Sequence, residues 1–500
     1  MTSAPYRHGG PAPFAHQLHA FETSRDRKAF ALLCEQGTGK SKMVVDTACW
    51  LWQRGEIDGV LVICPNSVKT NWVTDEIPRH HSPDVPWVAA WWSANGRAVD
   101  RERWRVAQSI APPAITLPWL VVNVESLSAR GEAYDACERF LDSRRVLLVV
   151  DESSKIKNRV KRTKAVIKLG QLAAYRRICS GTPVTQGPLD LFTQFRFLDS
   201  DILGFDTFTA YKNRYALFDT RFGFPKLIKY LNLDELQAKI APHSYRVTRA
   251  ECLDLPPKVY QKLEVDLAPA QRKAYNAMRD QMLVELGDGR SVSATIVLTK
   301  LLRLQQITGG FLPFVPPPDV DEGMQRAGLA LCAASTEPLP GPNPKVEALL
   351  DFVEQVPGKV IVWARFRAEL EAITHALVKE YGADAVVEFH GGVSDEGRTY
   401  ARQRFQDAAS RVRFFVAQTD VGGYGLTLTA AQSVVYYSNT FSLEARLQSE
   451  DRAMRIGQTG SVTYVDLIAR DTLDNRVLQA LRGKQDLASL VLAEPIREWI

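Results

Sequence analysis

The chain has 500 residues, of which 45% are hydrophobic and 24% charged, and its formal net charge is +5. This length exceeds one ordinary hydrophobic core and predicts two to four domains, while the composition excludes a disordered or fibrous protein. The sequence holds no apolar run of about 18 residues or more and no N-terminal signal pattern, so we expect neither a membrane span nor secretion.

The net charge and the cysteines further restrict the class of protein and the compartment in which we expect it. A mild positive balance permits a polyanion as partner without demanding one. The seven cysteines are scattered and lack the spacing of a zinc site. We expect reduced, buried thiols in a cytosolic protein.

The first half of the chain alternates short apolar runs, rich in branched residues, with helical patterns. Uninterrupted runs of this kind are typical of strands buried on both faces of a parallel sheet. The runs are residues 30–33, 60–63, 120–123, 146–150 and 177–180. The pattern predicts an α/β lobe over residues 1–250, with a helical protrusion near 200–245.

The middle of the chain has a different pattern. Residues 200–310 are predicted to be helical and amphipathic, with a break at Pro256 and Pro257. Residues 311–344 hold eight prolines and are typical of a surface excursion or an ordered linker. We therefore expect residues 251–344 to form a lobe junction with a helical protrusion and a proline-rich excursion.

The second half repeats the strand pattern of the first. Its apolar runs are residues 360–363, 386–389, 414–417, 434–437 and 462–465. These runs predict a second parallel-sheet lobe over residues 345–500.

A glycine-rich segment between the first predicted strand and the following helix has the context of a phosphate-binding loop. Gly37, Thr38 and Gly39 let backbone N–H groups approach phosphate oxygens. Lys40 would reach the β- and γ-phosphates, and Ser41 would bind Mg²⁺. The loop departs from the usual pattern, because Cys34 stands where a glycine is common.

Two carboxylates, Asp151 and Glu152, follow the strand predicted at 146–150. They lie at the carboxyl edge of the sheet, where open α/β sheets bind ligands. Asp151 would hold Mg²⁺ through water, and Glu152 would orient or deprotonate the attacking water. Such a pair alone is usually a solvated turn, but the upstream phosphate loop favours the catalytic interpretation.

A polar segment at residues 448–458 carries two arginines one helical turn apart, Arg452 and Arg455. Guanidinium groups so placed can stabilise the charge that develops on a γ-phosphate. Arg455 is the better arginine-finger candidate and Arg452 its partner, although the two roles could be exchanged. Together with the phosphate loop, these arginines predict a catalytic site built from both lobes.

Residues 151–158 resemble the Asp-Glu box and the Ile-Lys-Asn of Swi/Snf-type, remodeller-like ATPases of helicase superfamily two. The resemblance covers roughly residues 13–480 and is closest to the minimal short form of bacteria and phages. The other matching segments are residues 13–17, 64–72, 180–183, 359–366, 390–392, 419–428 and 448–458. The resemblance implies two RecA-like lobes in tandem, with ATP and Mg²⁺ as cofactors.

The resemblance also implies roles for single residues. Gln17 would read adenine, Thr182 would couple hydrolysis to the strand-binding surface, and Gly425 would lie in a glycine-rich motif that contacts both nucleotide and nucleic acid. Trp72 is either a nucleic-acid contact or, more often at such a position, a core residue. The remaining nucleic-acid or coupling residues are Asn66, Lys69, His390, Gly391, Thr419 and Gln448.

These features predict a DNA-stimulated ATPase that moves along double-stranded DNA, with single-stranded or forked DNA as the alternative track. A cytoplasmic, nucleoid-associated place in a bacterial or phage-infected cell suits this layout. A strand-separating or annealing helicase is one rival, disfavoured because the sequence shows no evident wedge hairpin. A DNA-binding scaffold or the motor subunit of a defence complex is the other, disfavoured because Lys40, Asp151, Glu152 and Arg455 are all present.

Overall fold

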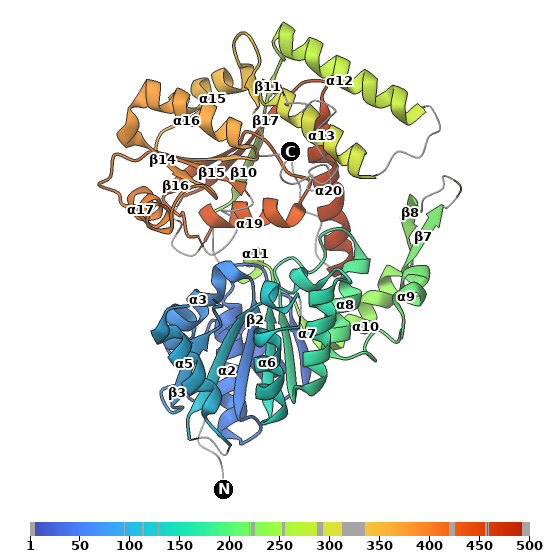
Figure 1. Ribbon diagram of the computed structural model, residues 1–500, viewed down its shortest axis with the longest axis vertical. Helices are drawn as coiled ribbons and strands as arrows, with labels where there is room; N and C mark the ends of the chain where they lie inside the picture. Colours follow the sequence, from blue (N-terminus) through green and yellow to red (C-terminus); the bar gives the residue numbers. More distant parts are fainter. Residues whose placement is uncertain are drawn as a thin grey trace. The chain divides into compact units, whose positions relative to one another are not determined.

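The computed structural model describes most of the chain, and the chain divides into two compact units. One unit comprises Met1–Asp254 and Asp486–Ile496, and the other comprises Leu255–Gln485 and Arg497–Ile500. Each unit is built on one parallel sheet with helices on its faces (Figure 1). The described residues are 6–94, 96–112, 115–128, 130–219, 221, 226–252, 256–287, 294–312, 336–419, 426–455, 458 and 460–492.

The first unit has a seven-stranded sheet in the order β3-β4-β2-β5-β6-β1-β9, and every neighbouring pair is parallel. The α/β fold predicted from the sequence is confirmed. The strand β3 was not predicted, because its mixed sequence of Trp, Val and Ala lacks the branched runs of its neighbours. The strands are β1 (Ala29–Leu32), β2 (Gly59–Cys64), β3 (Trp87–Trp91), β4 (Leu117–Asn123), β5 (Val146–Asp151), β6 (Tyr175–Cys179) and β9 (Ser244–Tyr245).

Helices connect these strands, as parallel neighbours require. The helices are α1 (Ala15–Ser24), α2 (Lys40–Gln53), α3 (Lys69–Asn71), α4 (Ile77–His80), α5 (Ala98–Ser109), α6 (Glu132–Asp142), α7 (Lys161–Leu172), α8 (Leu191–Leu198), α9 (Phe208–Tyr215), α10 (Leu233–Ile240) and α11 (Arg249–Cys252). Short 3₁₀ turns are η1 (Asn66–Val68), η3 (Val124–Leu127), η4 (Ser153–Ile156), η5 (Pro188–Asp190) and η6 (Ala241–His243), and η2 (Trp72–Glu76) is a π-helical turn.

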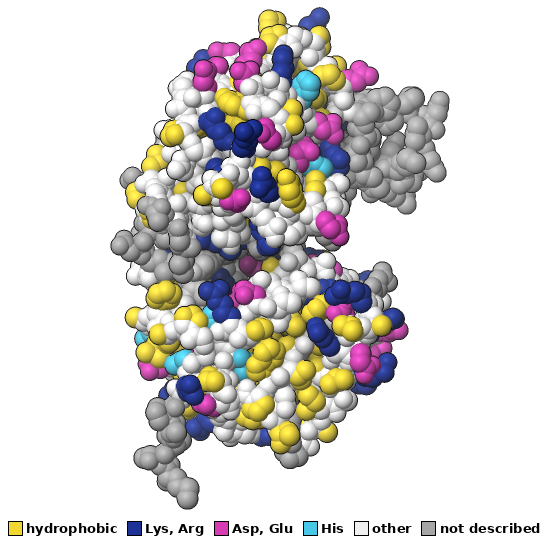
Figure 2. All heavy atoms as spheres, turned by 90° about the vertical axis from the view of Figure 1, so that its left-hand side faces the viewer, with side chains coloured by type: hydrophobic (Ala, Val, Ile, Leu, Met, Phe, Trp, Pro, Cys, Tyr) yellow, Lys and Arg dark blue, Asp and Glu magenta, His cyan; other side chains and the backbone are white. Residues whose placement is uncertain are grey.

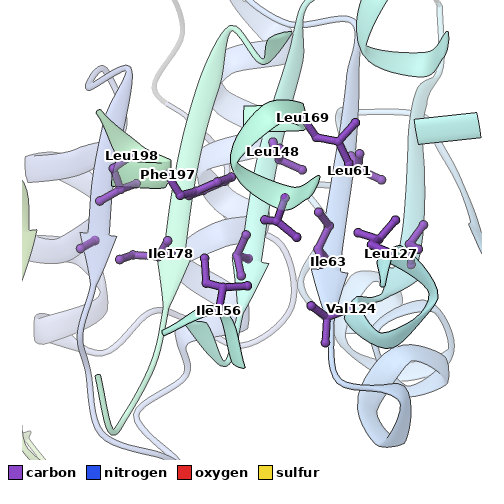
Figure 3. Packing of buried hydrophobic residues seen from close by; sticks show 14 of the residues in the cluster. Leu61, Ile63, Val124, Leu127, Leu148, Ile156, Leu169, Ile178, Phe197 and Leu198 are labelled. Atoms are coloured by element: carbon purple, nitrogen blue, oxygen red, sulfur yellow. The ribbon is translucent and has the colours of Figure 1, made fainter. Parts of the chain in front are cut away.

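The core of this unit explains its uninterrupted apolar runs. Leu61 and Ile63 of β2 belong to a cluster on one face of the sheet, whereas Val60 and Val62 belong to a cluster on the other. Because side chains alternate across a strand, burial of both faces requires apolar residues at every position. Figure 3 shows the first of these clusters, with Leu61, Ile63, Leu148 and Ile178 among its labelled residues.

An antiparallel hairpin formed by β7 (Ala216–Asp219) and β8 (Lys226–Tyr230) extends from α9 and α10 (Figure 1). The expectation that residues 200–310 are helical is therefore wrong for this segment. The hairpin itself was not predicted from the sequence. Both patterns were hidden because Lys and aromatic residues interrupt the alternation that marks a strand.

The second unit has a six-stranded sheet in the order β10-β17-β16-β13-β15-β14, again with parallel neighbours throughout. Its edge strand β10 follows Pro257 and lies inside the range predicted to be helical, so that prediction is wrong there too. The strands are β10 (Lys258–Val265), β13 (Lys359–Ala364), β14 (Val386–Phe389), β15 (Phe414–Gln418), β16 (Ala431–Tyr436) and β17 (Val462–Ala469), beside a small pair β11 (Phe311–Leu312) and β12 (Glu337–Pro338).

The helices of the second unit include the arginine-bearing helix α19. They are α12 (Pro269–Gly287), α13 (Ala294–Thr308), α15 (Pro344–Gln355), α16 (Arg367–Tyr381), α17 (Asp395–Gln406), α19 (Leu443–Ala453) and α20 (Leu473–Leu492), with a 3₁₀ turn η8 (Ala383–Ala385); from Asp486 on, α20 belongs to the first unit. Within the described parts of the chain, none of the helices combines the length and the hydropathy needed to cross a membrane. Most of the predicted excursion at 311–344 lies outside the described residues.

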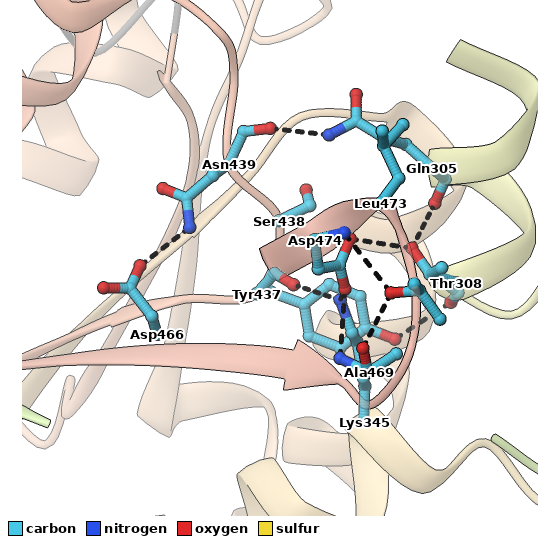
Figure 4. A network of polar contacts seen from close by, with 12 residues as sticks. Gln305, Thr308, Lys345, Tyr437, Ser438, Asn439, Asp466, Ala469, Leu473 and Asp474 are labelled. Carbon is cyan, nitrogen blue, oxygen red and sulfur yellow. Dashed lines mark hydrogen bonds and ion pairs between the residues drawn. The ribbon is translucent and has the colours of Figure 1, made fainter. Parts of the chain in front are cut away.

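A buried ion pair ties the elements of the second unit together (Figure 4). The Nζ of Lys345 lies 2.6 Å from Oδ2 of Asp474 and donates to the carbonyl of Tyr437. The other oxygen of Asp474 accepts from the hydroxyl of Thr308. This network holds α13, α15 and α20 against the end of β17. Removing either Lys345 or Asp474 would leave a buried charge without its partner, which is strongly destabilising.

Candidate functional site

The predicted phosphate loop joins β1 to α2, and two glycines give it its shape. Gly37 and Gly39 have φ values of 82° and 84°, in the left-handed region that favours glycine. A Cβ on Gly39 would lie 2.2 Å from Nε2 of Gln17, so the close approach of α1 requires a glycine as well. The loop is thus closed around the first turn of α2, whose backbone N–H groups are free of intrahelical partners.

The ammonium of Lys40 donates to the carbonyls of Cys34 and Glu35, at 2.9 and 3.1 Å. These acceptors belong to the loop itself. Phosphate oxygens could take their place without breaking an ion pair. Lys40 is thus the first residue of α2, with its ammonium turned back onto the loop.

Gln17 lies against the same loop. Its amide accepts from the backbone of Phe14 and donates to the carbonyl of Thr38, each at 3.0 Å. The ring of the neighbouring His16 contacts the same carbonyl at 2.8 Å. The residue expected to read adenine is thus joined to the phosphate loop.

Asp151 and Glu152 follow β5 at the carboxyl edge of the sheet. Glu152 has a φ of 50°, a left-handed conformation that costs a non-glycine residue free energy and that concentrates at functional sites. Its Oε1 accepts from Nε2 of Gln36 at 3.1 Å. This bond brings the predicted catalytic glutamate to the phosphate loop from 116 residues away in sequence.

The carboxylate of Asp151 has two donors. Oδ1 accepts from the backbone of Glu152 at 3.0 Å, and Oδ2 accepts from the indole of Trp72 at 2.9 Å. Burial raises the pKa of Asp151, while the Trp72 bond and the charge of Lys40 act in the opposite direction. A cation bound there would favour the charged form further.

Trp72 is 2% exposed, which makes it a core residue with a polar contact and excludes it from the protein surface. It opens the π-helical turn η2, and Glu76 closes that turn. Glu76 is hydrogen-bonded to Ser41 and to Asn71, and burial raises its pKa. Sequence reasoning missed Glu76, because nothing in the chain marks a π-helical turn.

The residues expected to couple hydrolysis to nucleic acid lie at the same edge of the first sheet. A Cβ on Gly181 would lie 3.0 Å from the backbone nitrogen of Gln36, so the segment before Thr182 packs on the phosphate loop. The Thr182 hydroxyl is buried and has no hydrogen-bond partner among the described residues. Asn66 is exposed, and the ammonium of Lys69 donates to the carbonyl of Trp92 at 2.9 Å.

A buried amide that the sequence did not single out connects two of these segments. Gln194 of α8 accepts from the hydroxyl of Ser153 at 2.6 Å and donates to the carbonyl of Pro183 at 2.8 Å. Lys157 also bonds the hydroxyl of Thr185. The segment after Asp151 and the segment after Thr182 are therefore held to one another.

In the second unit, the predicted arginines differ in their surroundings. Arg452 is 2% exposed and donates to the carbonyls of Gln448 and Leu426. Arg455 is half-buried and donates to the carbonyl of Asp451 and, at 3.0 Å, to the hydroxyl of Thr427. Arg455 thus has the more accessible guanidinium.

The helix that carries Arg452 is anchored by buried charges. Arg446 lies between Glu450 and Asp466, with its guanidinium 3.6 Å from the ring centre of Tyr436. Lys258 of β10 adds a second cation, 2.8 Å from Glu450. Burial opposes ionisation of Glu450, but these two cations prevail and lower its pKa to about 2.

The other predicted residues of this unit are placed as follows. The ring of His390 accepts from the backbone of Gly392, and Arg398 donates to the carbonyl of Gly391 at 3.3 Å. In the described residues, neither the hydroxyl of Thr419 nor the amide of Gln448 has a hydrogen-bond partner, although both are buried. Gly425 lies outside the described residues.

Comparison with known proteins connects both sets of residues to one family. The chain matches the SNF2-related domain over residues 19–309 and the helicase conserved C-terminal domain over residues 344–457. The chain belongs to the SNF2-related family. The matched ranges contain the phosphate loop and the Asp-Glu pair in the first domain and both arginines in the second.

Members of the SNF2-related family with similar sequence come from distant organisms. The protein CHROMATIN REMODELING 4 of Arabidopsis thaliana is 24% identical over 98% of this chain, and the uncharacterized ATP-dependent helicase MG018 of Mycoplasma genitalium is 26% identical over 92%. The chain spans 21% and 40% of the length of these two relatives. A solved structure, the Sulfolobus solfataricus SWI2/SNF2 ATPase core in complex with dsDNA, is 23% identical over 97% of this chain and 94% of its own, with a TM-score of 0.41.

Proposed function

We propose that this protein is an ATP-dependent DNA translocase, in which DNA-stimulated hydrolysis of ATP drives movement along double-stranded DNA. The observation that carries the proposal is the bond between Gln36 and Glu152, which sets a carboxylate beside a phosphate loop. A carboxylate at that place can orient the water that attacks the γ-phosphate. Membership of the SNF2-related family supports the same activity.

The first unit would hold the nucleotide. The backbone of Gly37, Thr38 and Gly39 would bind the phosphates at the N-terminus of α2, where the helix dipole favours anions. Lys40 would exchange its two carbonyl acceptors for phosphate oxygens. Gln17 would recognise adenine from its place against the loop.

Ser41 and Asp151 would hold Mg²⁺. A hydroxyl and a carboxylate are hard oxygen ligands of the kind that Mg²⁺ accepts together with water and phosphate oxygens. The metal would supply neutralisation of the phosphate charge, while Trp72 and the backbone of Glu152 keep the Asp151 carboxylate in place.

In the second unit, Arg455 would stabilise the charge on the γ-phosphate. Arg452, which is buried and donates to the carbonyls of Gln448 and Leu426, would hold the chain at Leu426. Of the two assignments that the sequence leaves open, accessibility favours Arg455 as the arginine finger.

The DNA backbone would contact both units. Buried polar atoms without partners among the described residues are costly unless a ligand or water completes them, which supports roles for Thr182, Thr419 and Gln448 in relaying nucleic-acid contact. Asn66, Lys69, His390 and Gly391 would contact phosphates, and at Gly391 a ligand could come close, because a Cβ there would meet no atom within 4 Å. Such contacts are sequence-independent and sensitive to salt.

Displacement of a triplex-forming strand from linear duplex DNA tests the proposal. The wild-type chain should displace the third strand only with ATP, and Lys40→Ala should not displace it at all. Equal displacement with and without ATP would refute translocation. A role on DNA would also put the protein in the cytoplasm of a bacterial or phage-infected cell, at the nucleoid.

Strand separation is the second candidate function, and the β7–β8 hairpin is the observation that favours it. A hairpin with exposed apolar side chains can hold apart the strands of an opened duplex. Unwinding of a forked duplex with a fluorescent strand separates this activity from translocation on closed duplex.

A further inference from the structure

The segment around the β7–β8 hairpin has an unusual composition. Residues 212–230 hold five Lys or Arg residues against one Asp, whereas the whole chain has a net charge of only +5. The same 19 residues hold five aromatic residues, of which Tyr215 is buried in the core: Tyr215, Phe218, Phe222, Phe224 and Tyr230. Basic residues interleaved with aromatic ones are typical of surfaces that bind nucleic acid. On the face shown in Figure 2, by contrast, Lys and Arg lie interspersed with Asp and Glu.

The hairpin also exposes apolar side chains beside its charges. Leu217 is 42% exposed and pairs across the strands with Lys229, while Ile228 is 56% exposed. The ammonium of Lys212 lies 3.9 Å from the ring centre of Phe218. A two-stranded hairpin buries little by itself, so its apolar groups remain available for contact with a ligand.

The base of the hairpin is fixed to the edge of the first sheet. The hydroxyl of Tyr230 donates to the carbonyl of Gln186 at 3.4 Å, and a Cβ on Gly187 would lie 2.2 Å from that hydroxyl. Asp190 in turn binds the backbone of Gln186 and of Thr185. The hairpin is therefore joined to the segment that follows Thr182.

We propose that the β7–β8 hairpin binds the unpaired strand of a branched DNA. Apolar and aromatic side chains can stack on the faces of unpaired bases, whereas a closed duplex offers them only phosphates and groove edges. The nearby Lys and Arg side chains, Lys229 among them, would follow the phosphates of that strand. This inference rests on the proposed action on DNA and adds a preference for branch points.

Binding without ATP tests the hairpin separately from the motor. Fluorescence anisotropy would compare a fork with single-stranded arms and a blunt duplex of the same paired length. The double variant Leu217→Ser, Ile228→Ser should lose affinity for the fork about 5- to 10-fold, as loss of apolar contact with the unpaired bases predicts, and keep its affinity for the blunt duplex. Leu172→Ser, at a 41% exposed leucine at the end of α7, is the matched control and should bind as wild type.

Unchanged fork binding, or an equal loss on fork and duplex, would overturn the hairpin proposal. Melting temperatures would show whether the double variant is folded, and Lys229→Glu provides a second variant at an exposed position with the same expected loss on the fork. Absence of any ATP turnover on duplex DNA would instead refute the translocase proposal while leaving fork binding measurable.

A different observation concerns the π-helical turn η2, which contacts both proposed magnesium ligands. Trp72 at its start donates to Asp151, and Glu76 at its end is bonded to Ser41. π-Helical turns are rare and frequent at functional sites. The turn continues directly from η1 and α3, which hold Asn66 and Lys69.

We infer that Trp72 and Glu76 are positioning residues that join the DNA-contacting segment to the magnesium ligands. A shift of η1 and α3 on DNA would move the π-helical turn, and the two side chains would carry that shift to Asp151 and Ser41. The inference rests on the proposed function, because it assumes that Asn66 and Lys69 contact DNA.

Trp72→Phe removes the indole donor and keeps an aromatic ring. Trp50→Phe is the matched control, because the Trp50 indole donates to Asp26 at 3.0 Å on an exposed part of the same unit. Binding of a fluorescent ATP analogue would be measured over a range of Mg²⁺ concentrations, with and without duplex DNA. Trp72→Phe should need several-fold more Mg²⁺ and should lose the effect of DNA on nucleotide affinity, while its affinity for DNA stays at the wild-type value.

If Trp72→Phe matched Trp50→Phe in all of these titrations, the positioning role would be refuted. A loss of nucleotide affinity without Mg²⁺ would also contradict it, because that result would indicate a general structural defect. Failure of the wild-type chain to bind DNA would refute the proposed function instead.

Discussion

The two parallel sheets end in sites of opposite character. In the first unit, Lys40 is bound to carbonyls of its own loop, which a ligand can replace. In the second unit, Arg446, Glu450 and Asp466 form a buried charge cluster whose members cannot be exchanged without leaving a charge unpaired. One site is therefore suited to take up a ligand, and the other to hold a helix and its arginines in a fixed position.

This contrast has a consequence for mutations. Changes at the phosphate loop should remove activity and spare stability. Changes in the charge cluster should reduce stability first. The predictions below separate these two outcomes.

Lys40→Ala should have the largest effect and reduce ATP turnover to background. The variant loses the Lys of the phosphate loop, but among the described residues the ammonium of Lys40 donates hydrogen bonds only to two carbonyls. We expect a melting temperature near that of the wild type, measured by circular dichroism. A strong loss of stability would show that the loop is a structural feature.

Arg455→Ala should lower the rate of hydrolysis on the order of a thousandfold, because an arginine finger acts mainly in the transition state. Single-turnover hydrolysis and nucleotide binding would be measured together, and nucleotide affinity should change little. Arg452→Ala is the comparison: its buried guanidinium holds two carbonyls, so we expect a lower melting temperature. If Arg452→Ala kept the wild-type melting temperature and lost more of the hydrolysis rate than Arg455→Ala, Arg452 would be the arginine finger and Arg455 its partner.

Glu450→Ala should destabilise the second unit by about 3–5 kcal/mol, since it leaves Arg446 and Lys258 with one buried carboxylate fewer. The pKa of Glu450 is lowered from 4.5 to about 2, so its stabilising effect is complete above pH 4.5 and is lost as the pH falls toward 2. The free energy of unfolding, measured with urea, should therefore fall less between pH 7 and pH 3 in the variant than in the wild type.

Glu235→Ala is the control for that experiment. Arg214 and neighbouring donors also lower the pKa of Glu235 to about 2, but the side chain of Glu235 is 31% exposed to water. Its removal should change stability little, because water screens the pair. If Glu235→Ala and Glu450→Ala lost the same amount of stability, burial would not be what makes the Glu450 cluster strong.

Gln17→Ala should have the smallest effect, a rise of about tenfold in KM for ATP, in line with the loss of one or two hydrogen bonds. Competition with GTP would show whether the preference for adenine is lost as well. Leu18→Ala, at an exposed neighbour in α1, should leave both values unchanged. If the KM of Gln17→Ala for ATP were unaltered, Gln17 would have only a structural role, through its hydrogen bond to the carbonyl of Thr38.

The sequence predicted the parts of the fold that have a strong local signal. Runs such as 60–63 and 146–150 are apolar at every position because both faces of the strand are buried, and all ten predicted strands are present. The strand β10 was missed because most of its exposed positions carry Gln, Lys or Glu, and its pairing with β17, far along the chain, defines it. Local pattern cannot show such pairing.

The residues of the candidate site likewise fall into those that the sequence could predict and those that it could not. Lys40 and Asp151 could be named because short motifs mark them. Gln36, Glu76 and Gln194 could not, since each matters through one bond to a residue far away in sequence. The contact of Trp72 with Asp151 likewise depends on how η2 packs against the end of β5.

The central claim is that nucleotide chemistry in the first unit depends on DNA. ATP turnover would be measured with blunt duplex, forked DNA, single-stranded DNA, RNA and no nucleic acid, with Glu152→Gln as the inactive control. The account predicts turnover that rises several-fold with duplex DNA in the wild type and stays at background in Glu152→Gln. Equal wild-type rates with DNA, with RNA and without nucleic acid would contradict it.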